Sequence, residues 1–255
     1  MNPLQRTLIE KAGNDNGFEH VLDSEANGVT LASARHPTRV WVGLENGAYH
    51  VRFQATSPTL LPELQRSFPQ MGIESGEFAI ATEAALATLL RRAASLARAL
   101  PSQAAADYQH AVATELAALP ASLAGTEVER LVRQRIGQNK FREAMLDYWG
   151  GACAVTGIAI PEVLRASHAK PWAECASDAE RLDVFNGFLL SANLDALFDR
   201  FLISFSYAGE LLVSSAILAN ERERLGLDKP MRLRWFAEEH LRYLQFHQAR
   251  FEEKT

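Results

Sequence analysis

Two apolar segments, joined by a polar loop and followed at once by a helical pattern, dominate the second half of the sequence. The first, PEVLRASHAKPW, ends in extended backbone, because Pro171 disfavours helix at the residue before it. A polar loop spans residues 173–183, and the apolar run VFNGFLLS then predicts a buried strand. SANLDALFDR starts a helix, for which Ser191 is the expected N-cap. This order predicts a compact ββα unit of two strands and one helix.

Four polar side chains of this segment indicate one kind of chemistry. His168 lies near the end of the first extended segment, Asn186 lies in the second, and Asp195 and Asp199 lie in the helix. Positions i and i+4 share a helix face, so both carboxylates can face the strand pair. A strand-end histidine is by itself more often a packed residue than a catalytic one. Beside two carboxylates, however, a neutral imidazole can take a proton from water while a bound divalent cation neutralises a scissile phosphate. The set therefore favours phosphodiester hydrolysis, and Asn186 is expected to fix the loop that orients His168.

At these residues the sequence resembles the HNH nuclease family, over roughly residues 128–215. GQNKFREAMLDYWGGACAVTG, ASHAKPW, RLDVFNGFLLS and LDALFDRFLISF occur in the order typical of bacterial restriction-type HNH endonucleases. The resemblance implies a ββα-metal nuclease domain in which His168 is the general base and Asn186 is the middle asparagine. It also implies that Asp195 and Asp199 are ligands of a catalytic Mg²⁺ or Mn²⁺. Asn193 takes the place of Asp195 if the register differs by two residues.

Departures from the family pattern bear on the metal. Many members have a metal-binding aspartate directly before the first histidine, where this chain has Ser167, a poorer ligand. The third family position holds Asp195 instead of histidine. These two differences keep open an alternative, a non-catalytic scaffold of HNH fold that binds DNA or protein.

Many family members also carry a structural zinc on paired cysteines. Cys153 has no second cysteine at that spacing and Cys175 stands alone, so no structural zinc is expected. Hydrophobic packing is expected to hold the unit together instead, through Tyr148, Trp149, Trp172 and Phe198.

Residues 130–142 contain five basic residues and no acidic one, although the whole chain carries a net charge of −5. They lie in a helix that Thr126 is expected to cap, with Glu129 completing a capping box. This helix face is either solvated or in contact with nucleic-acid phosphates, and Lys170 has the same two interpretations. The expected nucleic-acid contacts are Arg130, Arg133, Arg135, Lys140, Arg142 and Lys170.

The first part of the chain predicts a small α+β domain. A helix is expected over 1–13, and GVTLASA, TRVWVGL and YHVRFQA have the composition of strands, the last two joined by a tight turn at ENG. Further helices are expected within SPTLLPELQRSF, over 83–100 and over 103–119. PASLAGTE is the expected linker. It divides the chain into a domain over 1–120, for target recognition or partner binding, and an HNH nuclease domain over 121–255.

The C-terminal part predicts a hairpin in FLISFSYAGELLVS and an amphipathic helix in AEEHLRYLQFHQARF. His240 and His247 are seven residues apart, hence on one helix face, and no third metal ligand accompanies them. Both are expected on the surface of that helix.

The sequence lacks a segment with the length of a signal peptide or a membrane span, and two cysteines are too few for a disulfide framework. A cytoplasmic location is therefore expected. The resemblance implies a hydrolase, namely a metal-dependent HNH endonuclease that cuts DNA in restriction or in defence against foreign DNA. Its expected partners are DNA, a second copy of the chain in a homodimer, and other defence-system proteins, with no membrane involved. Cleavage of RNA instead of DNA stays open.

Overall fold

The computed structural model describes residues 1–55, 57–71, 73–74, 76–120 and 125–254. Contacts divide the chain into two compact units, Met1–Gln103 and Ala104–Thr255. Helices combine with small antiparallel sheets, so the predicted α+β class is confirmed.

The boundary between the units lies earlier than the sequence analysis placed it. The expected linker, residues 120–127, includes residues 121–124, which lie outside the described residues. The contacts separate at residue 103 because the helix α4 (Pro101–Ala117) buries Ala104, Tyr108 and Val112 in the second unit.

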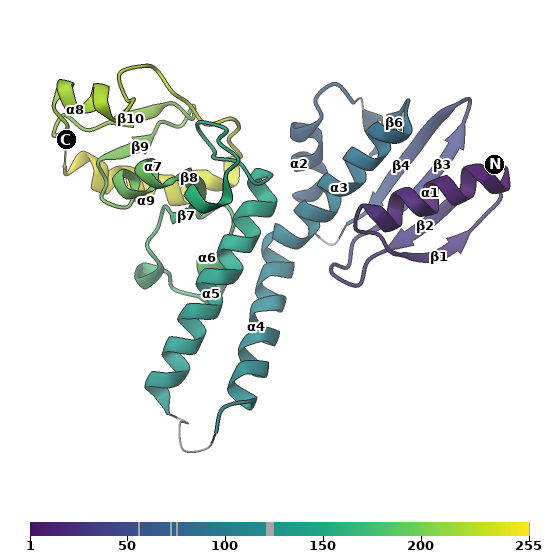
Figure 1. Cartoon of the computed structure of the whole chain (residues 1–255), viewed down its shortest axis with the longest axis horizontal. Helices are drawn as coiled ribbons and strands as arrows, with labels where there is room; N and C mark the ends of the chain where they lie inside the picture. Colours follow the sequence, from purple (N-terminus) through teal and green to yellow (C-terminus); the bar gives the residue numbers. More distant parts are fainter. Residues whose placement is uncertain (56, 72, 75, 121–124, 255) are drawn as a thin grey trace. The chain divides into compact units, whose positions relative to one another are not determined.

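The first unit is an antiparallel sheet in the strand order β1-β2-β3-β4-β6-β5, with helices packed on one face (Figure 1). Side chains that alternate along the strands, such as Val29, Leu31, Val40 and Val42, are fully buried beneath these helices. Helix α1 can approach β2 closely because Gly13 has no side chain; a Cβ there would lie 2.4 Å from a Leu31 methyl carbon. The helices are α1 (Pro3–Asp15), α2 (Leu60–Ser67) and α3 (Glu83–Ala99). The strands are β1 (His20–Ser24), β2 (Gly28–Ala32), β3 (Arg39–Glu45), β4 (Ala48–Gln54), β5 (Ile73–Glu74) and β6 (Glu77–Ile80).

The tight turn predicted at ENG is confirmed. Asn46 and Gly47 both have positive φ, 51° and 81°, and join β3 to β4 with Glu45 opposite Ala48. Two central residues of positive φ are the mark of the two-residue hairpin turn whose twist matches that of the flanking strands.

The second unit contains two separate pairs of antiparallel strands among helices. Strand β7 (Leu164–His168) pairs with β8 (Gly187–Ser191), and β9 (Ile203–Phe205) pairs with β10 (Leu211–Val213). The helices after α4 are α5 (Thr126–Trp149), α6 (Asp178–Leu182), α7 (Ala192–Phe198), α8 (Ala219–Arg224) and α9 (Leu241–Glu252). Short 3₁₀ turns occur at Pro161–Val163, Trp172–Glu174 and Glu238–His240.

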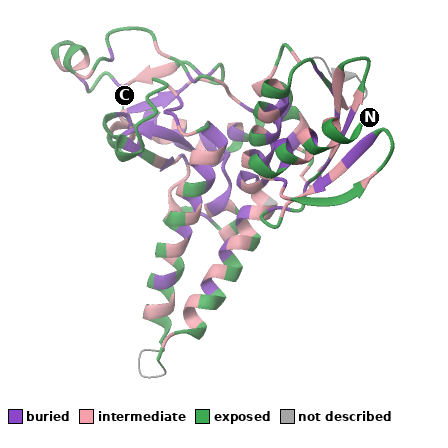
Figure 2. Ribbon diagram, turned by 45° about the vertical axis from the view of Figure 1, so that its right-hand side comes forward, coloured by how far each residue is buried: buried purple, intermediate pink, exposed green. Residues whose placement is uncertain are grey.

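The aromatic core of this unit is largely the predicted one. Tyr148, Trp149 and Phe198 are fully buried, and the strand β8 is buried along its whole length (Figure 2). Trp172 differs, because it is only half-buried and lies against Gly137 of α5. A Cβ at Gly137 would lie 2.1 Å from the indole, which explains a glycine in the middle of a long helix.

Two local predictions are wrong. Thr126 is the first residue of α5 and not its N-cap; Gly125 takes the cap position, and its carbonyl accepts a hydrogen bond from the Glu129 amide. The polar loop over 173–183 contains the short helix α6, N-capped by the Ser177 hydroxyl. Five residues are too few for a hydrophobic period, so the sequence pattern did not reveal this helix.

The expectation that His240 and His247 lie on the surface is also wrong, since both are fully buried. Helix α9 packs against β9, so the face that carries His247 belongs to the core. The His247 Nε2–H donates to the Phe198 carbonyl, and Nδ1 accepts from the Ser204 hydroxyl. Burial lowers the pKa of His247 to about 4. His240 stacks on Phe188 with the ring centroids 5.4 Å apart.

Within the described part of the chain, no helix has the length and apolar character needed to cross a membrane.

Candidate active site

The ββα unit predicted from the sequence is present. Strand β7 ends with His168 opposite Gly187 of β8, and α7 begins at the residue after β8 and packs against both strands. A Cβ at Gly187 would lie 2.0 Å from the Ser167 carbonyl oxygen. Glycine directly after Asn186 therefore allows the two strands to approach, which brings the Asn186 loop close to His168.

A pocket of about 540 Å³ opens beside the end of β7. His168, Asp195 and Asp199 all line it, so three of the four residues of the predicted constellation meet at one cavity. The rest of its wall comes largely from α5 and from the residues around β7. These lining residues include Gln138, Asn139, Phe141, Arg142, Arg165, Trp172 and Phe201.

The imidazole of His168 is held on three sides. Its Nε2 lies 2.8 Å from the Arg181 carbonyl oxygen, and since a carbonyl only accepts hydrogen bonds, Nε2 carries the proton. The ring stacks on Phe141 with centroids 3.7 Å apart, and Trp172 meets it edge-on at 5.8 Å. Burial lowers the pKa of His168 to about 4. The ring is therefore neutral at pH 7, with its lone pair on Nδ1.

Asp195 of α7 and Asp199, the residue that caps the C-terminus of α7, lie one helical turn apart. The Ser167 hydroxyl donates to Asp195 Oδ1 at 2.5 Å, so the residue at the family's aspartate position orients a carboxylate of the helix. Loss of hydration in the pocket and, second, the charge of Asp195 raise the pKa of Asp199 to about 6. Among the described residues, no ion pair joins either carboxylate to Arg165 or Arg200, the cations that could have filled the pocket.

This pair of carboxylates fits a divalent cation in part. Two adjacent carboxylates without a bonded cation are hard oxygen donors that repel each other, and Mg²⁺ is commonly bound by one or two carboxylates with water and substrate phosphate. In the part of the chain that is described, no three His, Cys, Asp or Glu side chains are arranged to hold a metal ion. The chain by itself therefore provides two ligands and not a closed site. Asn193, the rival ligand, instead accepts a hydrogen bond from the Ser191 hydroxyl.

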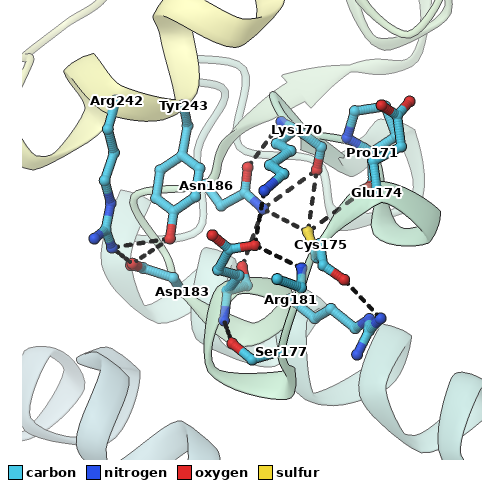
Figure 3. Close-up of polar contacts among 12 residues, drawn as sticks. Lys170, Pro171, Glu174, Cys175, Ser177, Arg181, Asp183, Asn186, Arg242 and Tyr243 are labelled. Carbon is cyan, nitrogen blue, oxygen red and sulfur yellow. Dashed lines mark hydrogen bonds and ion pairs between the residues drawn. The ribbon is translucent and has the colours of Figure 1, made fainter.

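Asn186 is fully buried and clamps the loop that follows His168 (Figure 3). Its Oδ1 accepts from the Lys170 amide at 2.8 Å, while its Nδ2 donates to the carbonyls of Lys170 and Glu180 at 3.2 and 3.0 Å. The Glu180 carbonyl belongs to the same short helix, α6, as the Arg181 carbonyl that binds His168. Asn186 thus fixes the backbone that fixes the imidazole, as its uncharged, two-ended amide predicts.

The turn before Asn186 is anchored to the C-terminal helix. The buried Asp183 carboxylate accepts from the Tyr243 hydroxyl at 2.8 Å and from the Arg242 guanidinium (Figure 3). The backbone carbonyl of Asp183 accepts a hydrogen bond from the backbone N–H of Asn186 at 2.8 Å. Burial raises the pKa of Asp183, an effect that these donors and the Arg242 charge oppose.

The predicted nucleic-acid contacts are occupied by other partners. Lys170 pairs with Glu180 at 2.9 Å, and four basic residues of α5 pair with glutamates that lie outside residues 130–142. A phosphate contact at any of these side chains would replace an existing ion pair, and such contacts stay a prediction. The pairs are Arg130–Glu127, Arg133–Glu129, Arg135–Glu115 and Lys140–Glu143, at 2.6, 2.8, 2.5 and 2.8 Å.

Arg142 differs from the other basic residues because it lines the pocket. Its guanidinium donates to the carbonyls of Leu164 and Pro161 at 2.7 and 2.9 Å and so ties α5 to the start of β7. Arg165 also lines the pocket and donates to the carbonyls of Glu162 and Leu164. Both guanidinium groups bind backbone carbonyls, and among the residues that the structure describes neither forms an ion pair with a carboxylate.

Sequence reasoning missed Phe141 and Arg165 as parts of the site. The signal for Phe141 was Gly137, one turn before it on the same face of α5, where a glycine interrupts good helix formers. A glycine inside a helix often marks a close neighbour, and here that neighbour is Trp172, the second ring beside His168.

Comparison with known proteins agrees with this geometry. Residues 153–206 match the sequence model of the HNH endonuclease family. The match covers β7, β8, α7 and β9 and lies within the segment, 128–215, that resembles this family. It spans less than half of the chain, and a search of curated proteins found no match.

Proposed function

We propose that the chain, whose residues 153–206 match HNH endonucleases, is a metal-dependent endonuclease that hydrolyses phosphodiester bonds of DNA. The observation that carries this proposal is the bond between His168 Nε2 and the Arg181 carbonyl. It leaves Nδ1 as a proton acceptor on a ring that lines the same pocket as two carboxylates. Activation of a water nucleophile needs such an acceptor close to the scissile phosphate.

In this mechanism His168 takes the proton of the attacking water on Nδ1. Phe141 and Asn186 are positioning residues, because they act on His168 and not on the substrate. Phe141 limits rotation of the ring by stacking, and Asn186 holds helix α6, whose Arg181 carbonyl accepts the hydrogen bond from Nε2–H. A base fixed in its orientation lowers the entropic cost of reaching the transition state.

Asp195 and Asp199 are the residues that would hold Mg²⁺ or Mn²⁺. When bound, such a cation neutralises negative charge on the phosphate and on the departing 3′ oxygen. Ser167 contributes by orienting Asp195 through its hydrogen bond rather than as a ligand. The raised pKa of Asp199 fits this role, because a bound cation would compensate the lost hydration of this carboxylate and offset the charge of Asp195.

In this proposal the substrate is bound first by Arg142 and Arg165, two basic residues that line the pocket. Phosphate contacts position nucleic acid without reading its sequence. DNA is proposed rather than RNA because residues 153–206 match HNH endonucleases and because the sequence motifs resemble those of restriction-type HNH endonucleases. We further propose a cytoplasmic role in restriction or in defence against foreign DNA, with target choice in the first unit. One ββα unit has one site, so cutting both strands requires a homodimer or two successive nicks.

A second candidate function is a non-catalytic scaffold of HNH fold. It is favoured by one observation: within the described residues, no third His, Cys, Asp or Glu joins Asp195 and Asp199 in a metal site. A scaffold would keep the ββα unit for DNA or protein binding and would not need the proton acceptor of His168.

The test is a plasmid cleavage assay with the full chain, on unmodified and modified supercoiled DNA with Mg²⁺, Mn²⁺ or EDTA. The matched variants are His168→Ala and His110→Ala, since His110 is an exposed histidine of α4. The proposal expects nicked or linear DNA that needs metal, persists in His110→Ala and disappears in His168→Ala. Absence of cleavage by the wild-type chain on every DNA and metal, with a retained gel shift, would replace the enzyme by the scaffold.

A further inference from the structure

The sheet of the first unit has a second hollow, on the face opposite its helices. Val40 and Val42 of β3 are buried under the helices, so the intervening Trp41 faces the other way. A pocket of about 360 Å³ lies on this outer face, and its walls include Trp41, Arg39, Arg52, Gln54, Asn27 and Glu25. These residues belong to β3, β4 and the turn before β2.

Trp41 lies flat on the sheet because two glycines make room for its ring. Gly28 and Gly43 are opposite each other on β2 and β3, and a Cβ at these positions would lie 2.4 and 2.3 Å from the indole. Glycine inside a strand lowers the stability of that strand, and here two glycines leave the space that the Trp41 ring occupies. The ring therefore has a defined place rather than being an accident of the surface.

The guanidinium group of Arg52 lies over the Trp41 ring. Its guanidinium carbon lies 4.1 Å from the Trp41 ring centre, and its Nε pairs with Glu77 at 2.8 Å. The Arg52 side chain is 57% exposed, so much of the guanidinium surface stays open to a ligand. A guanidinium held over an indole offers a flat, cationic surface for stacking.

The rim of the pocket carries groups that match a nucleotide. Arg39 is exposed, and in the part of the chain that is described its guanidinium forms no hydrogen bond or ion pair. The amides of Asn27 and Gln54 can both donate to and accept from the edge of a base, and the carboxylate of Glu25 can accept from it. A single free arginine beside a stacking surface suits one phosphate next to one base.

We infer that this pocket binds an unpaired nucleobase of a DNA strand. The base stacks on the Arg52–Trp41 pair, its edge meets Asn27, Gln54 and Glu25, and Arg39 binds the neighbouring phosphate. A base inside a duplex is covered by its neighbours, so the ligand is single-stranded or extruded from the helix. The inference rests on the proposed function only for the choice of DNA, since the pocket lies outside the candidate active site.

The test is fluorescence anisotropy with the full chain in EDTA, where no cleavage occurs. The probes are a labelled single-stranded 12-mer, the same sequence as a duplex, and the duplex with one bulged base; unlabelled deoxynucleoside monophosphate competes in a fourth arm. We expect the single strand and the bulged duplex to bind more tightly than the perfect duplex. Trp41→Ala should weaken single-strand binding roughly 5- to 150-fold, and Trp41→Phe should restore most of it.

Arg39→Gln provides a variant of an exposed residue that leaves the fold intact. It should weaken binding severalfold and reduce the dependence of affinity on salt by about one phosphate contact, whereas Arg35→Gln, at another exposed arginine, should change neither. Equal binding by Arg39→Gln, Arg35→Gln and wild type overturns the inference, as does a wild-type chain that prefers perfect duplex. Competition by the monophosphate at the affinity of the strand would also overturn it in favour of a free-nucleotide site. If His168→Ala loses plasmid cleavage but binds the single-stranded probe as wild type does, base binding at this pocket is independent of the proposed nuclease activity.

Discussion

The rings of His168 and Phe141 stack with their centroids 3.7 Å apart and their planes 18° from parallel. His168 ends a strand of the ββα unit, whereas Phe141 belongs to α5, which precedes that unit in the chain. The orientation of the proposed base therefore depends on a helix outside the ββα unit. The Arg181 carbonyl holds the ring at Nε2, so its position is set from two elements.

Replacing Phe141 tests this relationship. Phe141→Leu keeps the site apolar and should cost about 1 kcal/mol of stability. It removes the stacked ring, so we expect the turnover number for DNA cleavage to fall about tenfold with little change in KM. Phe251→Leu, at another buried aromatic residue of the second unit, is the control and should leave turnover unchanged. Equal turnover in both variants would show that stacking does not position the base.

Replacing Asn186 should destabilise the chain more than a typical polar substitution. Asn186→Ala removes an acceptor for the Lys170 amide and a donor to two carbonyls, at a cost of about 2–3 kcal/mol. Asn186→Asp keeps the acceptor but turns a carboxylate oxygen toward those carbonyls and should cost at least as much. Urea denaturation measures both, with the exposed Asn14→Ala as control. A free energy of unfolding within about 0.5 kcal/mol of wild type would contradict the clamp.

Gly137→Ala should behave opposite to helix propensity. Alanine in a helix interior is favoured over glycine by about 1 kcal/mol. Here its Cβ would lie 2.1 Å from the Trp172 indole, so the ring must move and the variant should be less stable. In a Trp172→Ala background the same change should become neutral or stabilising. A double-mutant cycle of unfolding free energies measures this coupling. Its absence would show that Trp172 does not occupy the space beside Gly137.

The buried His247 should make stability depend on pH on the acid side. Burial lowers its folded pKa to about 4 from an ordinary 6.5, so between these values the unfolded chain binds more protons than the folded one. Stability from this group is fully present above pH 6.5 and is lost as the pH falls toward 4, by on the order of 3 kcal/mol. His247→Phe should flatten the pH profile of the urea midpoint relative to wild type. The exposed His110→Gln should not, and an unchanged slope in His247→Phe would contradict the assignment.

The carboxylate pair can be tested without measuring activity. Because Asp199 carries a raised pKa beside Asp195, metal-free Asp199→Asn should be at least as stable as wild type at pH 8. Mn²⁺ at a large excess over its dissociation constant should raise the melting temperature of wild type, since a ligand of the folded state stabilises it. Asp195→Asn and Asp199→Asn should remove most of this shift. Equal shifts in the wild type, both variants and Glu210→Gln, a control at an exposed glutamate, would place the ion elsewhere.

The sequence by itself determined the local elements and the order of the site residues. The hairpin turn at Asn46 and Gly47, the strands around His168 and Asn186 and the helix that carries Asp195 and Asp199 follow from turn chemistry and hydrophobic period. These are properties of contiguous residues, so one chain suffices to predict them. The same holds for the HNH resemblance, which depends on short motifs in a fixed order.

Only the tertiary structure decided how side chains from distant segments meet. Period predicts which face of a helix is apolar but not what covers it, so the buried His247 was placed on the surface. Basic residues of α5 form ion pairs with glutamates outside residues 130–142. Ser167 donates a hydrogen bond to Asp195, and Phe141 stacks on His168. The physical reason is that burial, ion pairing and ring stacking are interactions across space. Their partners are chosen when the elements pack, and no local pattern in the chain records that choice.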